Sequence, residues 1–93
     1  MTTLESRIGV PEDVLLNEVG GEAVILNLET GQYYGLDEVG TRMWALLTQH
    51  GQVGTAYGAL LHEYDVGEEE LQTDLLHLID ELASHGLLQV DDS

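Results

Sequence analysis

The sequence contains no cysteine and no lysine, and Arg7 and Arg42 are its only basic residues apart from four histidines. The lack of cysteine excludes disulfides, zinc sites built on thiolates and cysteine nucleophiles. The lack of clustered Lys and Arg argues against a nucleic-acid ligand, because phosphate binding by counterion release depends on such residues. We therefore expect no nucleic acid among the partners of this protein.

Long apolar runs are missing as well. No stretch approaches the roughly 18 residues that a membrane-spanning helix needs. The first ten residues lack both the basic start and the apolar run of a signal peptide. These patterns predict a soluble, cytoplasmic protein without a membrane partner.

Acidic residues dominate the composition instead. Eighteen Asp and Glu residues face two arginines, which gives a formal net charge of −16. A surface of this kind repels nucleic acid and anionic membranes and attracts basic partners. The acidity is equally compatible with a role in solubility alone.

The length of 93 residues and the hydrophobic share of 43% indicate one small domain with one core. Residues 1–12 are polar and contain Gly9 and the only proline, Pro11. They are predicted to form a flexible N-terminal segment. The folded domain is expected over residues 13–90.

The first half of the domain has strand patterns. Residues 13–19 and 22–28 are joined by Gly20-Gly21, a pair suited to a tight hairpin. A second turn at residues 29–31 leads to a short aromatic strand at residues 32–36. The sequence therefore predicts a three-stranded antiparallel sheet in chain order.

The second half has helical spacing, which begins at Asp37, a residue type that caps helix N-termini. Helices are predicted from residue 37 or 38 to about 49, over 53–64, and from 68 until Ser84-His85-Gly86 stops the third; residues 87–90 can add a short final strand. Gly54 and Gly58 weaken the second helix, and a close helix–helix approach would explain them. The third helix has the clearest apolar stripe: Leu71, Leu75, Leu78, Ile79 and Leu82.

The predicted fold class is α+β, like a winged helix-turn-helix, with a three-stranded antiparallel sheet followed by three helices. The DNA-binding version of this architecture places a basic helix in the major groove. Here the third helix has no Lys or Arg, and its charged residues are all acids: Glu68, Glu69, Glu70, Asp74, Asp80 and Glu81. The winged helix-turn-helix prediction is therefore kept, but DNA binding is rejected.

No pattern of catalytic residues stands out. The chain has neither a nucleophile elbow nor a phosphate loop. His77, Asp80 and Glu81 share a helix face, but without a His-Glu-x-x-His pattern they are best interpreted as a solvated polar surface. We expect no enzyme, no cofactor and no metal site.

The third strand is the best candidate for binding. It is short, aromatic and uncharged, whereas exposed sheet edges are usually blunted by lysine, proline or inward-pointing charge. An open edge of this kind can accept a peptide as an added strand. Tyr34 shares its side of the strand with Leu36, so we expect Tyr34 on the helix-packed face and Tyr33 to be freer.

These residues resemble a known family. The run from Glu29 to Gly40, followed by Met43-Trp44-Ala45-Leu46-Leu47, is similar to the PqqD-like leader-recognition domains of peptide natural-product pathways. Further matches in the second half are Tyr64-Asp65, Leu75-Leu76, Leu82 and Gly86-Leu87-Leu88. The resemblance covers about residues 10–90.

The resemblance implies a non-catalytic RiPP recognition element. Such domains hold the leader of a ribosomally made precursor as an extra strand between the third strand and the third helix. The candidate peptide-binding residues are then Gln32, Tyr33, Tyr34, Gly35 and Leu36 on the strand and Glu70, Leu71, Asp74, Leu75 and Leu78 on the helix.

The Thr-Gly-x-Tyr-Tyr-x-Leu motif is most similar to that of stand-alone family members from lasso-peptide pathways. This implies a leader with a Tyr-x-x-Pro motif, a leader-removing cysteine protease and an ATP-dependent macrolactam cyclase as partners. A basic, lysine-rich leader would suit the acidity of the chain. Two alternatives stay open: a PqqD-type peptide chaperone for another pathway, such as pyrroloquinoline quinone synthesis, and an acidic winged-helix regulator or DNA mimic.

Overall fold

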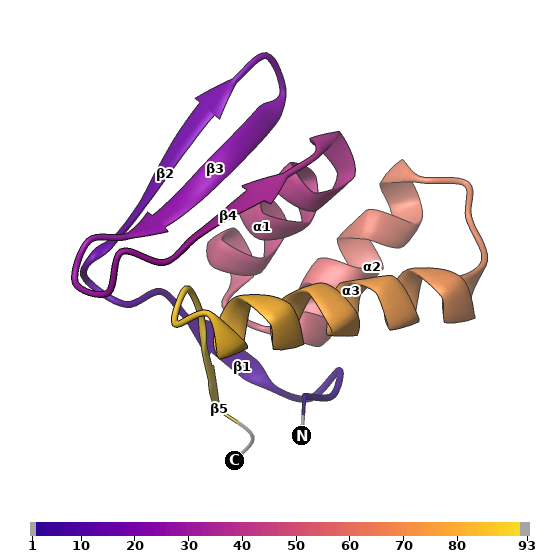
Figure 1. The fold of residues 1–93 in the computed structure, drawn as a ribbon. Coiled ribbons are helices and arrows are strands. Elements are labelled where there is room, and N and C mark those ends of the chain that lie inside the picture. The colour runs from indigo at the N-terminus through magenta and orange to yellow at the C-terminus, as the bar shows by residue number, and fades with distance from the viewer. Residues whose placement is uncertain (1, 92–93) are drawn as a thin grey trace.

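The computed structural model describes residues 2–91, which form two small sheets and three helices (Figure 1). The elements follow in the order β1 (Arg7–Gly9), β2 (Val14–Val19), β3 (Glu22–Asn27), β4 (Tyr33–Leu36), α1 (Glu38–His50), α2 (Val53–Glu63), α3 (Glu68–Ser84) and β5 (Gln89–Asp91). The predicted fold class, a three-stranded antiparallel sheet followed by three helices, is confirmed.

The main sheet has the strand order β2-β3-β4 and is antiparallel throughout. Gly20 and Gly21 have φ angles of 64° and 86°, a left-handed conformation that glycine adopts without steric cost, and they form the predicted hairpin turn. Ile25 at the centre of β3 pairs with Leu16 on one side and with Tyr34 on the other. This order leaves β4 at one edge of the sheet.

Strand β1 was not predicted from the sequence. It pairs antiparallel with β5, so that Ile8 lies opposite Val90. Further backbone hydrogen bonds tie this region to the α1–α2 connection: the Ile8 N–H donates to the carbonyl of Gly51, which follows α1, and the N–H of Val53, the first residue of α2, donates to the Ser6 carbonyl, each at 3.0 Å. The N-terminal segment therefore has a strand where we expected a loose lead-in, and the domain boundary after residue 12 stays a prediction.

The helix ends follow the predicted signals. The Asp37 carboxylate accepts a hydrogen bond from the Gly40 N–H at 2.7 Å, which confirms Asp37 as the N-cap of α1. Gly51, with φ of 70°, ends the same helix. Helix α2 ends at Glu63, one residue earlier than predicted.

The helix–helix explanation for Gly54 and Gly58 is wrong. A Cβ atom on Gly54 would lie 2.8 Å from the carbonyl oxygen of Leu4, so it is the N-terminal segment that approaches this glycine. A Cβ atom on Gly58 would meet nothing within 4 Å. The approach could not be foreseen because it depends on the unpredicted strand β1.

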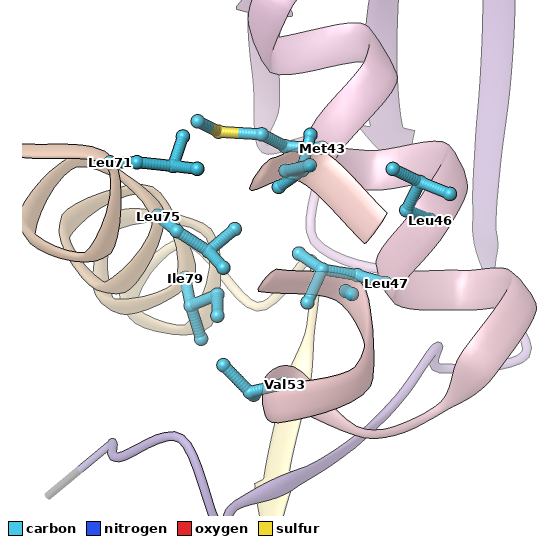
Figure 2. Packing of buried hydrophobic residues seen from close by; sticks show 9 residues of the cluster. Met43, Leu46, Leu47, Val53, Leu71, Leu75 and Ile79 are labelled. Carbon is cyan, nitrogen blue, oxygen red and sulfur yellow. The ribbon is translucent and has the colours of Figure 1, made fainter. Parts of the chain in front are cut away.

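The core consists of two neighbouring groups of buried side chains. The first fills the space between the three helices, where Leu71, Leu75 and Ile79 of α3 point toward α1 and α2 (Figure 2). The second joins the covered face of the sheet to α1, α3 and the segment after α3; its members are Ala23, Ile25, Leu36, Trp44, Leu82, Leu87 and Leu88. Together they hold α3 beside the sheet.

Asn27 is a buried polar residue that links distant parts of the chain. Its side-chain amide donates to the Gly86 carbonyl at 2.8 Å, and its oxygen accepts from the N–H groups of Glu29 and Thr30. Buried polar groups are costly unless they are paired in this way. Asn27 thereby ties the turn before β4 to the C-terminal end of α3.

Candidate peptide-binding groove

The open edge of β4 has two residues whose backbone groups point away from the sheet. The Asn27 N–H donates to the Gln32 carbonyl at 2.8 Å, which makes Asn27 and Gln32 a hydrogen-bonded pair. Such pairs alternate along an antiparallel ladder, so Ile25–Tyr34 and Ala23–Leu36 are the next ones. The N–H and C=O groups of Tyr33 and Gly35 therefore face outward and are available to another strand.

A cavity of about 320 Å³, which we call the strand pocket, lies beside this edge. The end of β4, the first turns of α1 and the middle of α3 form its walls. The lining residues are Tyr34, Gly35, Leu36, Asp37, Val39, Gly40, Met43, Asp74, His77 and Leu78. The pocket thus combines a free strand edge with the facing side of a helix.

A smaller cavity of about 190 Å³, the helix pocket, adjoins the strand pocket. The two share Val39, Met43 and Asp74. The remaining lining residues come from the α2–α3 connection and the start of α3: Tyr64, Val66, Glu70 and Leu71. The two cavities form one groove that begins at β4 and continues along α3.

A third hollow, of about 540 Å³, lies across the end of the sheet and is lined by residues of β2, β3 and β4 together with Asp37. It is larger, but no helix is among its lining elements except for the cap residue of α1. We favour the strand pocket as the binding site because a peptide there would contact both a strand edge and a helix face.

The groove is acidic. Asp37, Glu70 and Asp74 line it, and neither arginine does so in the part of the chain that the structure describes. His77 lies in the strand pocket with its Nε2 atom 3.7 Å from the Glu81 carboxylate. The charge of the groove therefore favours a basic ligand.

Arg42 is engaged outside the groove. Its guanidinium donates to both carboxylate oxygens of Glu63, with Nε distances of 2.9 and 3.0 Å, and so joins α1 to α2. This hydrogen bonding raises the pKa of Arg42 and lowers the pKa of Glu63. The Tyr57 hydroxyl donates to the Glu68 carbonyl at 2.8 Å, and desolvation together with the charges of Glu68 and Glu69 raises its pKa.

The predicted strand residues fall on both sides of the sheet. The Tyr33 side chain is 69% exposed on the uncovered face, whereas Tyr34 is half-buried and packs beside Leu36. The expectation that Tyr34 faces the helices is confirmed. Gln32 lies in the turn before β4 and is exposed.

The predicted helix residues are divided between the two pockets and the core. Asp74 and Leu78 line the strand pocket, and Glu70, Leu71 and Asp74 line the helix pocket. Leu75 is fully buried in the core and lines neither cavity. The groove therefore brings together Tyr34, Gly35 and Leu36 with the predicted helix residues except Leu75, which lies underneath it. Gln32 and the Tyr33 side chain line neither cavity.

Other lining residues were missed by sequence reasoning, namely those from α1 and the α2–α3 connection: Asp37, Val39, Gly40, Met43, Tyr64 and Val66, together with His77 of α3. Val39 and Met43 carried a helical signal, but periodicity does not say which helix flanks a sheet edge. Exposure gives a further signal, because Val39 and Val66 are among the large apolar side chains that remain exposed.

Two structural features bear on other function classes. Within residues 2–91, no three His, Asp or Glu side chains gather in a way that could hold a metal ion. Over the same residues, no helix combines the length and the apolar character needed to cross a membrane.

Comparison with known proteins identifies relatives. The family model described as coenzyme PQQ synthesis protein D (PqqD) matches residues 22–88. The solved structure of TbiB1 in complex with the TbiA(beta) leader peptide is 34% identical in sequence, with a TM-score of 0.79 over 86% of this chain and 93% of that one. No curated protein matches the chain.

A second solved structure, lasso peptide synthetase B1 complexed with the leader peptide, has a TM-score of 0.78 at 17% identity. It covers 89% of this chain and 98% of that one. At this level of identity the likeness shows the fold alone.

Proposed function

Because the chain belongs to the PqqD family, we propose that it binds the leader segment of a ribosomally made precursor peptide and performs no chemistry itself. The observation that carries the proposal is the open edge of β4 beside the strand pocket. Tyr33 and Gly35 present free backbone groups there, and Asp74 and Leu78 of α3 lie opposite.

The leader adds to β4 as a further strand. Backbone hydrogen bonds to Tyr33 and Gly35 supply affinity that does not depend on the leader's sequence. Alternate leader side chains then point toward α3, where the strand pocket selects among them. The proposed peptide-binding residues are those predicted from the sequence, with Leu75 acting by supporting α3 from the core.

The relative TbiB1, which is 34% identical to this chain, is described in complex with a leader peptide and supports leader binding. A role in lasso-peptide synthesis rests on the similarity of the Thr-Gly-x-Tyr-Tyr-x-Leu motif to members from lasso-peptide pathways. We propose that the bound leader is presented to a leader-removing cysteine protease and to an ATP-dependent macrolactam cyclase in the cytoplasm. The leader is expected to be basic and to contain a Tyr-x-x-Pro motif. Residues 13–90 are proposed to be the recognising domain.

Coenzyme PQQ synthesis is the second candidate, and the name of the matching family model favours it. The binding mode would be the same, but the partner would be a different modified peptide. We favour lasso-peptide synthesis because the Thr-Gly-x-Tyr-Tyr-x-Leu motif that includes β4 is most similar to members from lasso-peptide pathways.

Amide-shift mapping tests the proposal. The TbiA(beta) leader peptide, and peptides selected from a random display library on the full chain, are titrated into the ¹⁵N-labelled protein. We expect the largest shifts at Tyr33, Gly35, Asp74 and Leu78. Shifts confined to β2 and α2, with β4 and α3 silent for every peptide, would contradict strand addition.

A pair of variants separates binding from folding. Asp74→Ala removes an exposed side chain of the groove, so binding should weaken while the free energy of unfolding stays nearly constant. Leu75→Ala truncates a fully buried side chain and should cost roughly 2–5 kcal/mol of stability. Equal loss of binding and stability in Asp74→Ala would show that this residue acts only through the fold.

A further inference from the structure

The helix pocket has a composition that the strand-addition mode does not explain. Its walls are apolar, with Val39, Met43, Val66 and Leu71 among them, but two carboxylates, Glu70 and Asp74, also line it. At about 190 Å³ it holds a long side chain. An apolar cavity with acids in its wall calls for a ligand group that is itself apolar along its length and positively charged at its end.

Glu70 and Asp74 are the two carboxylates that line the helix pocket. They are four residues apart on α3 and therefore lie on the same helix face, where like charges repel. Within residues 2–91 neither makes an ion pair or a side-chain hydrogen bond. The helix dipole favours Glu70 in the first turn, but Asp74 lies beyond that turn.

Neither arginine of the chain supplies a cation to the helix pocket. Arg42 is bound bidentately by Glu63, and Arg7 belongs to β1, which pairs with β5 away from the groove. His77 lies near Glu81 rather than in the helix pocket. No basic side chain within residues 2–91 pairs with Glu70 or Asp74, so both carboxylates are available to a cationic ligand group.

Building on the proposed function, we propose that the helix pocket is a specificity site for a lysine or arginine of the leader. The methylene stem lies against Met43, Val66 and Leu71, and the charged head stays at the rim beside Glu70 and Asp74. Lysine and arginine commonly bury their stems in this way while their heads remain in water. A leucine would fill the space but leave both carboxylates unpaired, and an acidic side chain would be repelled.

The position of this residue in the leader follows from the groove. The helix pocket adjoins the strand pocket at Val39 and Met43, beyond the end at which β4 leads into α1. The basic residue therefore lies just outside the segment that pairs with β4. A leader that continues the antiparallel order of the sheet places it before that segment in its own sequence.

The test compares two double variants that remove the same charge. Glu70→Gln with Asp74→Asn neutralises the helix pocket and keeps its shape. Glu68→Gln with Glu69→Gln neutralises the same helix end but leaves the pocket lining intact. Random peptides displayed on phage are selected on the full wild-type chain, and the selected peptides are then measured against both variants.

We expect the selected peptides to share a Lys or Arg at a constant distance from their strand-forming segment. Replacing this residue by norleucine should weaken binding to the wild type and to the Glu68/Glu69 control about tenfold. The same replacement should leave the affinity for the Glu70/Asp74 variant unchanged, because this variant has no carboxylates in the helix pocket to attract the charge.

The outcomes separate the two proposals. Peptides without a basic residue at a constant position, or an equal effect of norleucine on both double variants, overturn the pocket assignment. If such peptides still shift the amides of Tyr33 and Gly35, strand addition stands and only the specificity site is lost. If those amides are silent for every selected peptide, the proposed function fails and this inference fails with it.

Discussion

At the scale of the residue, the side chain and the backbone of Tyr33 have different roles. Its ring lies on the uncovered face of the sheet, while its N–H points to the open edge of β4. The ring therefore lies outside the groove, and the backbone group is the part that a leader strand would use.

Tyr33→Pro is expected to abolish most leader binding without unfolding the domain. Proline has no N–H and its ring obstructs an incoming strand, but the β3–β4 ladder does not use this N–H. Tyr33→Ala keeps the N–H and should bind nearly as well as the wild type. Titration of a selected peptide, with circular dichroism to check the fold, measures both effects; equal affinity of the proline and alanine variants would contradict an edge role for this residue.

The residue scale also shows what alternation along a strand can predict. The alternation of the strand predicted that Tyr34 and Leu36 lie on the same face of the sheet, and the structure confirms it. The Tyr34 ring is half-buried, and its centroid lies 5.5 Å from that of the His85 ring in an edge-to-face arrangement. The direction of the Tyr33 N–H was not readable. It depends on which pairs of the β3–β4 ladder are hydrogen-bonded, and this is set by the turn at Gly31.

At the scale of the element, helix α2 carries a matched pair of glycines. Gly54→Ala should destabilise the protein, because the new Cβ atom would lie 2.8 Å from the Leu4 carbonyl oxygen and would displace the N-terminal segment. Gly58→Ala meets open space and should stabilise the protein by about 1 kcal/mol through helix propensity. Chemical denaturation of both variants measures the two signs. A stabilising Gly54→Ala would show that residues before β1 do not pack on α2 in solution.

The ion pair between Arg42 and Glu63 links α1 to α2 and should make their packing depend on pH. Its hydrogen bonds lower the pKa of Glu63 below the ordinary value of 4.5, so the folded state holds this proton less tightly than the unfolded chain. The contribution is therefore present above that ordinary pKa and is lost as the pH falls through the lowered one. Both side chains are partly exposed, so the effect is small.

Glu63→Gln measures this contribution. The wild type should have a higher Tm than the variant at neutral pH, and the difference should disappear in acid. Glu18→Gln removes the same charge from β2, where no ion pair is found within residues 2–91, and corrects for the general repulsion between acids. A difference that persists in acid would mean that Glu63 acts through packing instead.

Elements with strong local signals were predictable from the sequence. Such signals are the turn glycines, the Asp37 cap and the leucine stripe of α3, each of which acts over a few residues. They were sufficient to predict the three strands of the main sheet and the three helices. Strand β1 has three residues, and the β5 residues that pair with them are 80 to 84 positions away in the chain. Such a pairing leaves no local pattern, so neither β1 nor the packing of Leu4 on Gly54 could be foreseen.

The groove was predictable in part for the same reason. The edge strand and the margin of α3 have readable patterns, so Tyr34, Asp74 and Leu78 were identified as its candidates. The residues that α1 contributes could not be predicted, because Val39 and Met43 line the groove only through the way in which α1 packs beside α3. The helix pocket depends on that packing and on the path of the chain at Tyr64 and Val66.

At the scale of the whole molecule, the net charge of −16 acts on stability and on binding in opposite ways. Acids spread over the surface repel one another and destabilise the compact state. The same field draws a basic peptide toward the groove, where Asp37, Glu70 and Asp74 lie. Both effects are screened by salt, with a Debye length of about 8 Å at physiological ionic strength.

Raising the salt concentration should therefore increase the Tm of the free protein and weaken its binding to a basic leader within the same series of buffers. Exposed charge pairs contribute only about 0.2–1 kcal/mol each, but several of them together should change the affinity roughly tenfold. Thermal melts and peptide titrations at low and high salt measure the two trends. A neutral peptide of matched length, with norleucine in place of lysine, should bind with the same affinity throughout. If the basic peptide also binds equally at low and high salt while the Tm still rises, the acids of the groove serve only to solvate the protein.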